Sequence, residues 1–427
     1  MPDLPRARIV TSPAQKSCNL RGVAADRARA GCDSGGLAAG WPQHKAKGAT
    51  MNQRVTVLLP TFNRAGLIGE TLDRLLGQTR LPDEIIVIDD GSEDATPEVL
   101  AGYGERITVL RKQNAGKAAA LNDGLARARG DLIWINDDDD LILPETCARL
   151  AGALEADPGL DFCAGRHEDF EVNPKTGARD HRAPGYWRPS QPDEIFPDLL
   201  EGCHIFQPGL MVRRAVYDRV GPFRTDLTRS QDYEMILRIA RHHRGRVLPE
   251  LAFLHREHKG ARGSAGERFA AQQNADRWKV FNHRIFSALL ADLDDAELFD
   301  PVQWQGTAPE ARPRLAAIKR GCVMARQRMW IEALPTWRDA VLRDTGPFSP
   351  AEIALLHRST TSPLGAPELF DDPAVRLALR DLSRCGPRGQ QILRVLQRST
   401  RWQLRRALQR REWLQSARIM RFLIPFS

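Results

Sequence analysis

The sequence predicts an α/β protein with a mostly parallel sheet, helices on both faces of that sheet, and a mainly α-helical region after it. From Met51 onward, short β-branched apolar runs alternate with segments whose apolar residues recur at helical spacing. The runs are apolar throughout rather than at every second position, which is typical of parallel strands buried on both faces. After residue 262, helical spacing dominates up to residue 427.

Four strands and three helices are expected to alternate in the first part of this region. The strands are predicted at 55–59, 84–88, 107–110 and 132–136, and the helices at 67–76, 96–103 and 115–129. Pro97 is expected at the first position of the second helix, and Gly130 ends the third. Residues 145–260 continue as mixed α/β. They include a Pro/Gly-rich loop at 173–197, in which Tyr186 and Trp187 either stack on a ligand or pack under the loop.

Composition narrows the class of protein. The 427 residues exceed one ordinary domain, and a net charge of +8 permits anionic partners without specifying one. Residues 1–50 lack periodicity and are predicted to be a disordered or non-native extension, with the folded protein starting at Met51. Seven cysteines without a C-x-x-C pair argue against a disulfide framework or a zinc ribbon, and predict reduced thiols in the cytoplasm. No apolar stretch long enough to span a bilayer is found, and residues 1–30 lack a signal-peptide core.

Acidic residues follow two of the predicted strands. Asp137–Asp140 is a run of four carboxylates directly after the fourth strand, and Asp89-Asp90 follows the second. The carboxyl ends of parallel strands are where such sheets bind ligands. Grouped carboxylates repel one another unless a cation or a proton joins them, and Mg²⁺ or Mn²⁺ prefers oxygen ligands. The run therefore predicts a metal site, with a solvated acidic turn as the alternative.

The residues around these strand ends suit a nucleotide. Neither a Walker A loop nor a G-x-G-x-x-G loop follows the first strand, which excludes P-loop and dinucleotide sites. Asp89-Asp90 suits a nucleobase or ribose hydroxyls, and Asp137–Asp139 suits ribose plus a metal that bridges a diphosphate. Lys117, at the start of the third helix, is either a cation near phosphate or a solvated helix lysine.

Three segments together resemble a known family. They are VTVLLPTFNRAGLIGETLDRLLGQTRLPDEIIVIDDGSEDAT from Val55, NAGKAAALNDGLARARGDLIWINDDDDLILP from Asn114, and VGPFRTDLTRSQDYEMILRIARHHRG from Val220. These segments resemble family 2 glycosyltransferases, with Asp137-Asp138-Asp139 as the D-x-D motif. The resemblance covers residues 54–258. It implies a GT-A fold at 51–262, with a nucleotide-sugar half at 51–144, an acceptor half at 145–262, and the helical region at 263–427.

The resemblance also implies a role for each matching residue. Asp232 would be the general base, and Asp139 and His258 would hold Mn²⁺ or Mg²⁺. The base and ribose pocket and the diphosphate side of the nucleotide sugar would be lined by nine further residues, namely Pro60, Thr61, Asn63, Asp89, Asp90, Asn114, Lys117, Asp137 and Asp138. The alternative for Asp232 is a helix N-cap, because Gln231-Asp232 opens an amphipathic helix.

The implied activity is metal-dependent, inverting transfer of a sugar from a nucleotide-diphosphate sugar, with a UDP-sugar expected, in polysaccharide or cell-surface glycan biosynthesis. The acceptor would be a hydroxyl of a glycan, a lipid-linked molecule or a protein. One departure is Gln231, where the family usually has Glu, so acceptor contacts are expected to differ. QNADRW at 273–278 has one residue too many for the Q-x-x-R-W motif of processive synthases, and no membrane span lies nearby.

Two rival functions remain open at this point. A nucleotidyltransferase also places carboxylates at strand ends, although it usually needs a Gly-rich basic loop where Pro60-Thr61-Phe62-Asn63 stands. A non-catalytic adaptor that keeps the fold is the second rival, and the retained Asp139 and Asp232 argue against it.

The basic tail at 381–427 holds eleven arginines against Asp381 and Glu412, with tryptophans and leucines between them. Such a helix fits either peripheral contact with the inner face of an anionic membrane or packing on its own domain with solvated arginines. No motif supports nucleic-acid binding.

Overall fold

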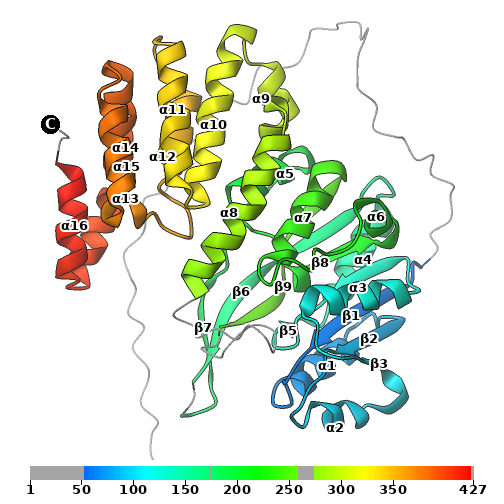
Figure 1. The fold of residues 1–427 in the computed structure, drawn as a ribbon. Coiled ribbons are helices and arrows are strands. Elements are labelled where there is room, and N and C mark those ends of the chain that lie inside the picture. Colours follow the sequence, from blue (N-terminus) through cyan, green and yellow to red (C-terminus); the bar gives the residue numbers. More distant parts are fainter. Residues whose placement is uncertain (1–51, 174, 258–273, 425–427) are drawn as a thin grey trace, which may run out of the picture. The chain divides into compact units, whose positions relative to one another are not determined.

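The computed structural model describes residues 52–173, 175–257 and 274–424, as shown in Figure 1. The predictions for residues 1–50 and for His258 therefore lie outside the described residues. No helix in the described ranges is long and apolar enough to cross a membrane.

The predicted alternation of strands and helices is confirmed over the first part of the chain. In chain order the elements are β1 (Val55–Thr61), α1 (Ile68–Leu76), β2 (Glu84–Asp89), α2 (Thr96–Ala101), β3 (Thr108–Arg111), α3 (Lys117–Arg127) and β4 (Leu132–Ile135). Each boundary falls within a few residues of its prediction. Pro97 is the second residue of α2 rather than the first, and α3 starts at Lys117 because Gly116, with φ of 89°, is its N-cap.

The second part of the sheet region is also mixed α/β, as predicted. Its elements are β5 (Leu141–Ile142), α4 (Thr146–Ala156), β6 (Phe162–Val172), β7 (Arg179–Pro184), α5 (Ile195–Glu201), β8 (Leu210–Arg213), α6 (Arg214–Val220), α7 (Gln231–His242) and β9 (Gly245–Glu257).

The prediction of a loop over 173–197 is wrong in part. β7 lies inside this range and pairs antiparallel with β6, and α5 begins at Ile195. β7 is a polar strand whose hydrogen bonds come from its partner, so the apolar pattern that marks buried strands is missing. Trp187 packs against the Arg166 guanidinium, 5.3 Å from its ring, and the Tyr186 hydroxyl accepts a bond from Arg326. Neither ring lines the cavity described below, which favours the packing alternative for both.

Within the described residues the strands form one nine-stranded sheet in the order β3-β2-β1-β4-β8-β6-β9-β5, with β7 paired to β6. The first four strands of this order are parallel. β8 runs antiparallel to both β4 and β6, so β6 and its parallel neighbour β9 point in the same direction as β1. Most strands therefore run in one direction, which confirms the predicted mostly parallel sheet. The sheet is mixed because a few strands, such as β8, run antiparallel to their neighbours.

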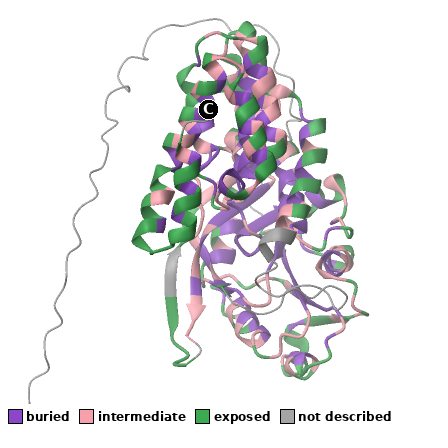
Figure 2. Ribbon diagram, turned by 60° about the vertical axis from the view of Figure 1, so that its left-hand side comes forward, coloured by how far each residue is buried: buried purple, intermediate pink, exposed green. Residues whose placement is uncertain are grey.

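Alternate residues of the central strands supply two hydrophobic clusters, one for each face of the sheet. Val57 and Leu59 of β1 belong to the cluster that includes α1 and α4. Leu58 faces the other way, toward the cluster that includes α3 and α7. The buried colour along the central strands in Figure 2 reflects this two-sided packing. The sheet is thus covered on both faces, as continuous apolar strands require.

The described part of the C-terminal region is helical, as predicted. Its helices are α8 (Asn274–Asp292), α9 (Pro301–Gln305), α10 (Arg312–Arg326), α11 (Trp330–Arg343), α12 (Pro350–Arg358), α13 (Glu368–Asp371), α14 (Pro373–Ser383), α15 (Pro387–Gln409) and α16 (Trp413–Leu423). The cluster on the α3 and α7 side of the sheet continues through these helices to Phe422. Among the described residues the last strand, β9, ends at Glu257, and the core continues into the helices described after it.

Gly321 of α10 lets this helix approach α11 closely. A Cβ at this position would overlap the indole of Trp337, whose Nε1 donates to the Ile318 carbonyl at 3.1 Å. Trp337 is fully buried, so the ring has no free space in which to move. The contact depends on the missing side chain and packs α10 and α11 side by side in the core.

We expect Gly321→Ala to destabilise the protein by about 1–3 kcal/mol, because the added methyl group overpacks the contact with Trp337. Gly152→Ala is the matched control, since Gly152 lies inside α4 with nothing near its missing Cβ. This control should gain up to about 1 kcal/mol from helix propensity. Urea unfolding of both variants gives the comparison, and equal stabilities would contradict the close contact.

A buried ionic cluster around Glu201, at the end of α5, joins the sheet region to α10 and α12. Its carboxylate contacts Lys319 and Arg358, the latter at 2.9 Å, and its carbonyl accepts from Arg326 at 2.7 Å. Burial alone would raise the pKa of Glu201, but the charges of Lys319, Arg358 and Arg326 outweigh it and lower that pKa from 4.5 to about 2. The ionised carboxylate thus stabilises the folded state.

We expect Glu201→Gln to reduce the free energy of unfolding at pH 7 by about 3 kcal/mol, since each unit of pKa shift is worth about 1.4 kcal/mol. A lowered pKa means that this contribution is complete above pH 4.5 and is lost as the pH falls toward 2. The difference between wild type and variant should therefore shrink between pH 5 and pH 3 in denaturant titrations. The control Glu310→Gln, at an exposed position, should match wild type in free energy of unfolding at every pH in this range.

Candidate functional site

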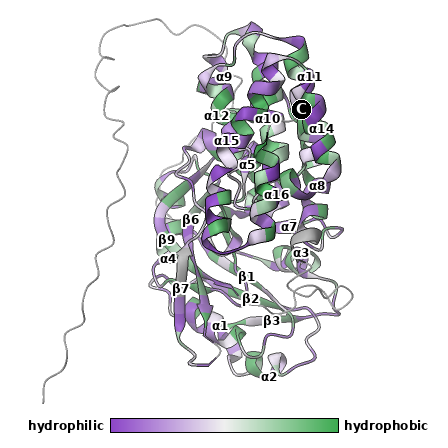
Figure 3. Cartoon of the chain, turned by 90° about the vertical axis from the view of Figure 1, so that its left-hand side faces the viewer, coloured by the Kyte–Doolittle hydropathy of each residue, from purple (hydrophilic) through white to green (hydrophobic). Residues whose placement is uncertain are grey.

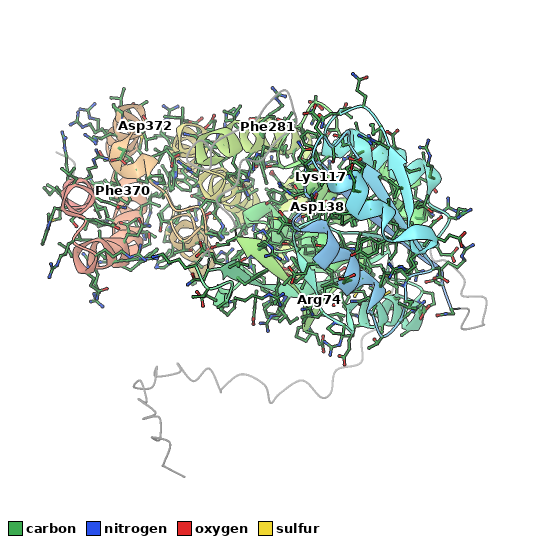
Figure 4. The ribbon with its side chains drawn as sticks, turned by 90° about the horizontal axis from the view of Figure 1, so that it is seen from below. Arg74, Lys117, Asp138, Phe281, Phe370 and Asp372 are labelled. Atoms are coloured by element: carbon green, nitrogen blue, oxygen red, sulfur yellow. The ribbon has the colours of Figure 1, made fainter. Side chains whose placement is uncertain are left out.

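A cavity of about 590 Å³ opens where β1, β2 and β4 end, and the segment leading into α7 closes its other side. Lys117 and Asp138, both labelled in Figure 4, line it together. The cavity brings together every predicted site residue except Asp89 and His258. Those that line it are Pro60, Thr61, Asn63, Asp90, Asn114, Lys117, Asp137, Asp138, Asp139 and Asp232.

Asn63 shapes the turn after β1. It adopts a left-handed φ of 54°, which Asn tolerates better than most residues. Its backbone N–H donates to the Ser92 hydroxyl at 2.9 Å, and its side-chain oxygen accepts from the Glu93 N–H at 2.8 Å. The turns after β1 and β2 are therefore tied to each other at the cavity edge.

Asp89 and Asp90, predicted together, have different positions. Asp89 is fully buried beneath the cavity, where it accepts from the Ser92 N–H at 2.8 Å and lies 3.6 Å from Arg111. Asp90 lines the cavity and accepts from the N–H groups of Ala115 and Gly116, at 3.0 and 2.7 Å. Burial raises the pKa of Asp90, and these two bonds oppose that shift. Asp90 thereby holds the turn from which α3 and Lys117 start.

The aspartate run is divided between the cavity and the protein interior. Asp137, Asp138 and Asp139 line the cavity, and the side chains of the last two are only 13% and 14% exposed. Asp140 is buried, accepts from the Arg256 N–H at 2.9 Å and precedes β5 rather than a helix. A fully solvated turn does not fit this burial, and Asp140 has a structural position.

Two cations face the carboxylates in the cavity. Lys117 forms an ion pair with Asp137, and Arg64 lies 3.4 Å from Asp138 and 4.0 Å from Asp139. Burial lowers the pKa of Lys117, but the charges of Asp137, Asp232 and Asp139 outweigh it and raise that pKa above its ordinary value. The pairing of Lys117 with Asp137 at the cavity favours the alternative of a cation in the site over a solvated lysine.

The carboxylates remain crowded in spite of these cations. Burial first, and then the charge of Asp139, raise the pKa of Asp138 from 3.8 to about 7. The pKa of Asp140 is also raised, by burial above all. A carboxylate whose pKa is raised by burial and by a neighbouring negative charge is stabilised by added positive charge.

The donor set fits a hard cation that shares its ligands with a bound molecule. Among the described residues no group of three or more His, Cys, Asp or Glu side chains could hold a metal ion by itself. Asp138 and Asp139 nevertheless offer carboxylate oxygens to one cavity, and Mg²⁺ commonly takes one or two carboxylates together with substrate phosphates. The crowding that raises the pKa of Asp138 is what such a cation relieves. Mn²⁺ or Mg²⁺ would thus be held by these carboxylates and by ligand oxygens.

Asp232 lies in the first turn of α7, on the side of the cavity away from the strand ends. The N-cap of this helix is Ser230, with a left-handed φ of 57°, so the N-cap alternative for Asp232 is wrong. Asp232 is half-buried and accepts from the Tyr233 N–H at 2.8 Å. Its neighbour Gln231 is buried at the same edge.

A buried polar network holds the start of α7 from behind. The Ser230 hydroxyl donates to Asn282 of α8 at 3.0 Å, and the Asn282 amide donates to Gln327 at 2.9 Å. The Gln327 amide in turn donates to the Leu200 carbonyl at 3.0 Å and to the Tyr233 hydroxyl at 3.2 Å. The residues on either side of Asp232 are thus fixed by the helical region.

Several residues that line the cavity were not predicted from the sequence, among them Arg64 and His255. Arg64 contacts the aspartates directly, and it stands next to the predicted Asn63. His255 lines the cavity with its Nδ1 3.0 Å from Asp169, three residues before the predicted His258. Both stand close to predicted site residues in the sequence, but spacing alone does not show that their side chains line the cavity.

Sequence comparison agrees with this geometry. Residues 56–221, from β1 to just beyond α6, match the model of glycosyl transferase family 2. This part of the chain is a family 2 glycosyltransferase domain. The match includes the aspartate run and ends before Asp232. The role proposed for Asp232 therefore depends on its position at the cavity and on the resemblance of the segment that contains it.

Relatives of this glycosyltransferase domain carry the same general description. The uncharacterized glycosyltransferase YwdF of Bacillus subtilis is 28% identical over 229 residues, which is 52% of this chain and 80% of YwdF. An uncharacterized glycosyltransferase of Haemophilus influenzae is 26% identical over 43% of this chain, and the match spans 61% of that relative. Among solved structures, S. aureus TarS is similar with a TM-score of 0.46 and 19% identity, covering 76% of this chain and 54% of TarS. The family assignment rests on the sequence match.

We expect Asp90→Asn to weaken nucleotide binding by the glycosyltransferase domain and to lower its stability by about 1–3 kcal/mol. The substitution replaces one carboxylate oxygen by an NH₂ group, which cannot accept a hydrogen bond. The backbone N–H of either Ala115 or Gly116 then loses its acceptor in a partly buried place. Calorimetric titration with UDP and Mn²⁺, together with urea unfolding, measures both effects. The exposed Asp193→Asn is the matched control, and unchanged values for Asp90→Asn would contradict the bridging role.

Proposed function

We propose that the chain is a metal-dependent, inverting glycosyltransferase that moves a sugar from a nucleotide-diphosphate sugar to an acceptor hydroxyl. The observation that carries this proposal is that one cavity is lined both by Asp137–Asp139, which follow β4, and by Asp232, at the start of α7. A UDP-sugar is the first donor to test. The acceptor is a glycan, a lipid-linked molecule or a protein, within cytoplasmic synthesis of a polysaccharide or cell-surface glycan.

The donor half of the proposed site comes from β1, β2 and β4. Thr61 and Asp90 line the end that we assign to base and ribose, and Asp137 and Asp138 the end that we assign to ribose and diphosphate. A bound Mn²⁺ or Mg²⁺ supplies positive charge that neutralises the nucleoside diphosphate leaving group. Asp139 is assigned to that metal, and Lys117 and Arg64 add positive charge of the chain's own on the same side.

The acceptor half of the proposed site is the start of α7. We assign Asp232 as the general base, which accepts the proton of the acceptor hydroxyl as its oxygen attacks the anomeric carbon. One direct displacement breaks the bond from sugar to phosphate while the new glycosidic bond forms on the opposite face, which inverts the anomeric configuration. The transition state resembles an oxocarbenium ion, as in glycoside hydrolysis. The half-buried position of Asp232 supports this assignment, since a hydroxyl can still reach it.

A thermal-shift screen with Mn²⁺ tests the donor class directly. A ligand that binds the folded state raises the melting temperature, by an amount that grows with the logarithm of its concentration relative to its Kd. UDP-glucose, UDP-N-acetylglucosamine and GDP-mannose should be compared with ATP and CTP under the same conditions. Stabilisation by a nucleotide sugar supports the proposal. Stabilisation by nucleoside triphosphates alone, with pyrophosphate as product, would instead indicate a nucleotidyltransferase.

We expect Asp139→Asn and Asp232→Asn to fail at different stages. Asp139→Asn should lose Mn²⁺-dependent donor binding together with transfer, since its carboxylate is assigned to the metal. Asp232→Asn should bind the donor normally and lose about 10²–10⁴-fold in turnover, the usual contribution of a general base. Calorimetry with a donor, and release of nucleoside diphosphate to water or to acceptor, separate the two effects.

Asp218→Asn is the matched control for both variants. Asp218 is an exposed carboxylate of α6 outside the cavity, so the same loss of charge should change neither binding nor turnover. Wild-type turnover by both test variants would reject the assignment of the site. A non-catalytic adaptor would show no nucleoside diphosphate release from any variant, wild type included.

A further inference from the structure

The outer face of α15 carries a row of arginines that point away from the core. Arg394, Arg398, Arg401 and Arg405 are all exposed and follow the i, i+4, i+7, i+11 spacing that places residues on one side of a helix. The opposite side of the helix is buried, with Ile392 and Leu396 among its core residues. We refer to these four arginines as the arginine row.

The arginine row has no carboxylate partner within the part of the chain that the structure describes. In the segment 384–421 the ion pairs of arginines are those of Arg384 with Asp381, at 3.9 Å, and of Arg418 with Asp371, at 3.2 Å. Unpaired cations packed along one side of a helix repel one another, and each gains free energy from an anionic surface. The charge of the row is therefore available to a partner outside the chain.

Large apolar side chains lie exposed on the same pair of helices. On α16, Trp413 and Leu414 are 67% and 79% exposed, and Ile424 just beyond it is 64% exposed. The other face of α16 is already packed, since Phe422 is buried against Phe370 with ring centroids 5.5 Å apart. Figure 3 shows apolar colour along α16. The exposed apolar residues of this pair of helices, which we call the apolar rim, are Trp402, Leu408, Trp413, Leu414, Met420 and Ile424.

We propose that α15 and α16 bind the surface of an anionic lipid bilayer. The arginine row matches phosphate headgroups in charge, and clusters of four or more arginines on an amphipathic helix are typical of contact with anionic lipids. The apolar rim discriminates between a membrane and a soluble polyanion. Tryptophan and leucine gain free energy when they enter the boundary between headgroups and acyl chains, and gain little from a hydrated polyanion.

The packing of α16 determines how the helices lie on the bilayer. Ile419 and Phe422 hold one side of α16 in the core, so the helix presents its apolar rim while remaining part of the folded protein. Binding of this kind needs no unfolding and no insertion of a whole helix. It adds a shallow apolar contact to the electrostatic attraction of the arginine row.

Co-sedimentation of the full chain with vesicles tests the proposal. The vesicles are phosphatidylcholine alone, and phosphatidylcholine mixed with phosphatidylglycerol. Wild type should bind the mixed vesicles and bind phosphatidylcholine weakly, and added salt should reduce the binding. Replacing Arg398, Arg401 and Arg405 by Gln should weaken binding about 100-fold, since each arginine near an anionic surface contributes about fivefold.

A second triple variant tests the apolar contribution. Trp413→Ser, Leu414→Ser and Ile424→Ser together should weaken binding to mixed vesicles at least tenfold, because their burial in the interface is lost. The arginine control replaces the exposed Arg127, Arg219 and Arg343 by Gln, and the apolar control replaces the exposed Leu81, Val302 and Leu342 by Ser. Both controls should bind as wild type does. Thermal unfolding verifies that each variant is folded.

Three outcomes would overturn the proposal. Absence of wild-type binding to mixed vesicles is the first. Equal binding by the test variants and their controls is the second. The third is loss of binding in the arginine variant alone, accompanied by wild-type affinity of the serine variant for both vesicles and soluble polyphosphate, which would identify the surface as a polyanion site.

Discussion

The structure around the cavity depends on one electrostatic constraint, namely that several carboxylates meet at one edge of the sheet and must be balanced there. Parallel strands end at the same edge, so Asp90 after β2 and Asp137–Asp139 after β4 are brought together by the fold itself. Lys117 and Arg64 balance part of this charge from two sides. Burial and the charge of Asp139 still raise the pKa of Asp138, so the negative charge is only partly balanced by these two cations. Under the proposed function, a divalent cation that arrives with the donor would balance the remainder.

The same constraint explains why neighbouring aspartates have different positions. Asp140 turns into the protein, where its carboxylate accepts from the backbone N–H of Arg256, and Arg256 Nε donates to the Asp139 carbonyl at 2.7 Å. This pair of bonds fixes the peptide that carries Asp139 and leaves its side chain at the cavity. Asp89 has a similar role beside Asp90, because its buried carboxylate accepts from the Ser92 N–H and so stabilises the turn that follows β2. Asp89 and Asp140 are thus buried and support the backbone from inside, while Asp90 and Asp139 line the cavity.

The local sequence pattern was sufficient to predict the strands, the helices and the edge of the sheet where the candidate site lies. Continuous apolar runs and carboxylates after a strand can both be recognised from residues that are adjacent in the sequence. It failed at β7, whose polar residues become a strand only through pairing with β6. It also failed for Arg64 and His255, since facing inward depends on the turn after β1 and on the path of β9, which sequence spacing does not encode. The division of Asp89 from Asp90 was unpredictable for the same reason. Two adjacent carboxylates differ in burial only once the turn that follows them is built.

The helical region has a direct physical link to the proposed base. Asp232 is flanked by Ser230 and Tyr233, and both are held by a chain of buried amides that runs through Asn282 and Gln327. Each amide in this chain is used as a donor, so removing one would leave a buried polar group without a partner, at a cost of about 1–3 kcal/mol. The Glu201 cluster adds a second link close by, through Arg326, which is adjacent to Gln327. The left-handed Ser230 that starts α7 is therefore stabilised by contacts from outside the sheet region, and the orientation of Asp232 toward the cavity depends on both halves of the chain.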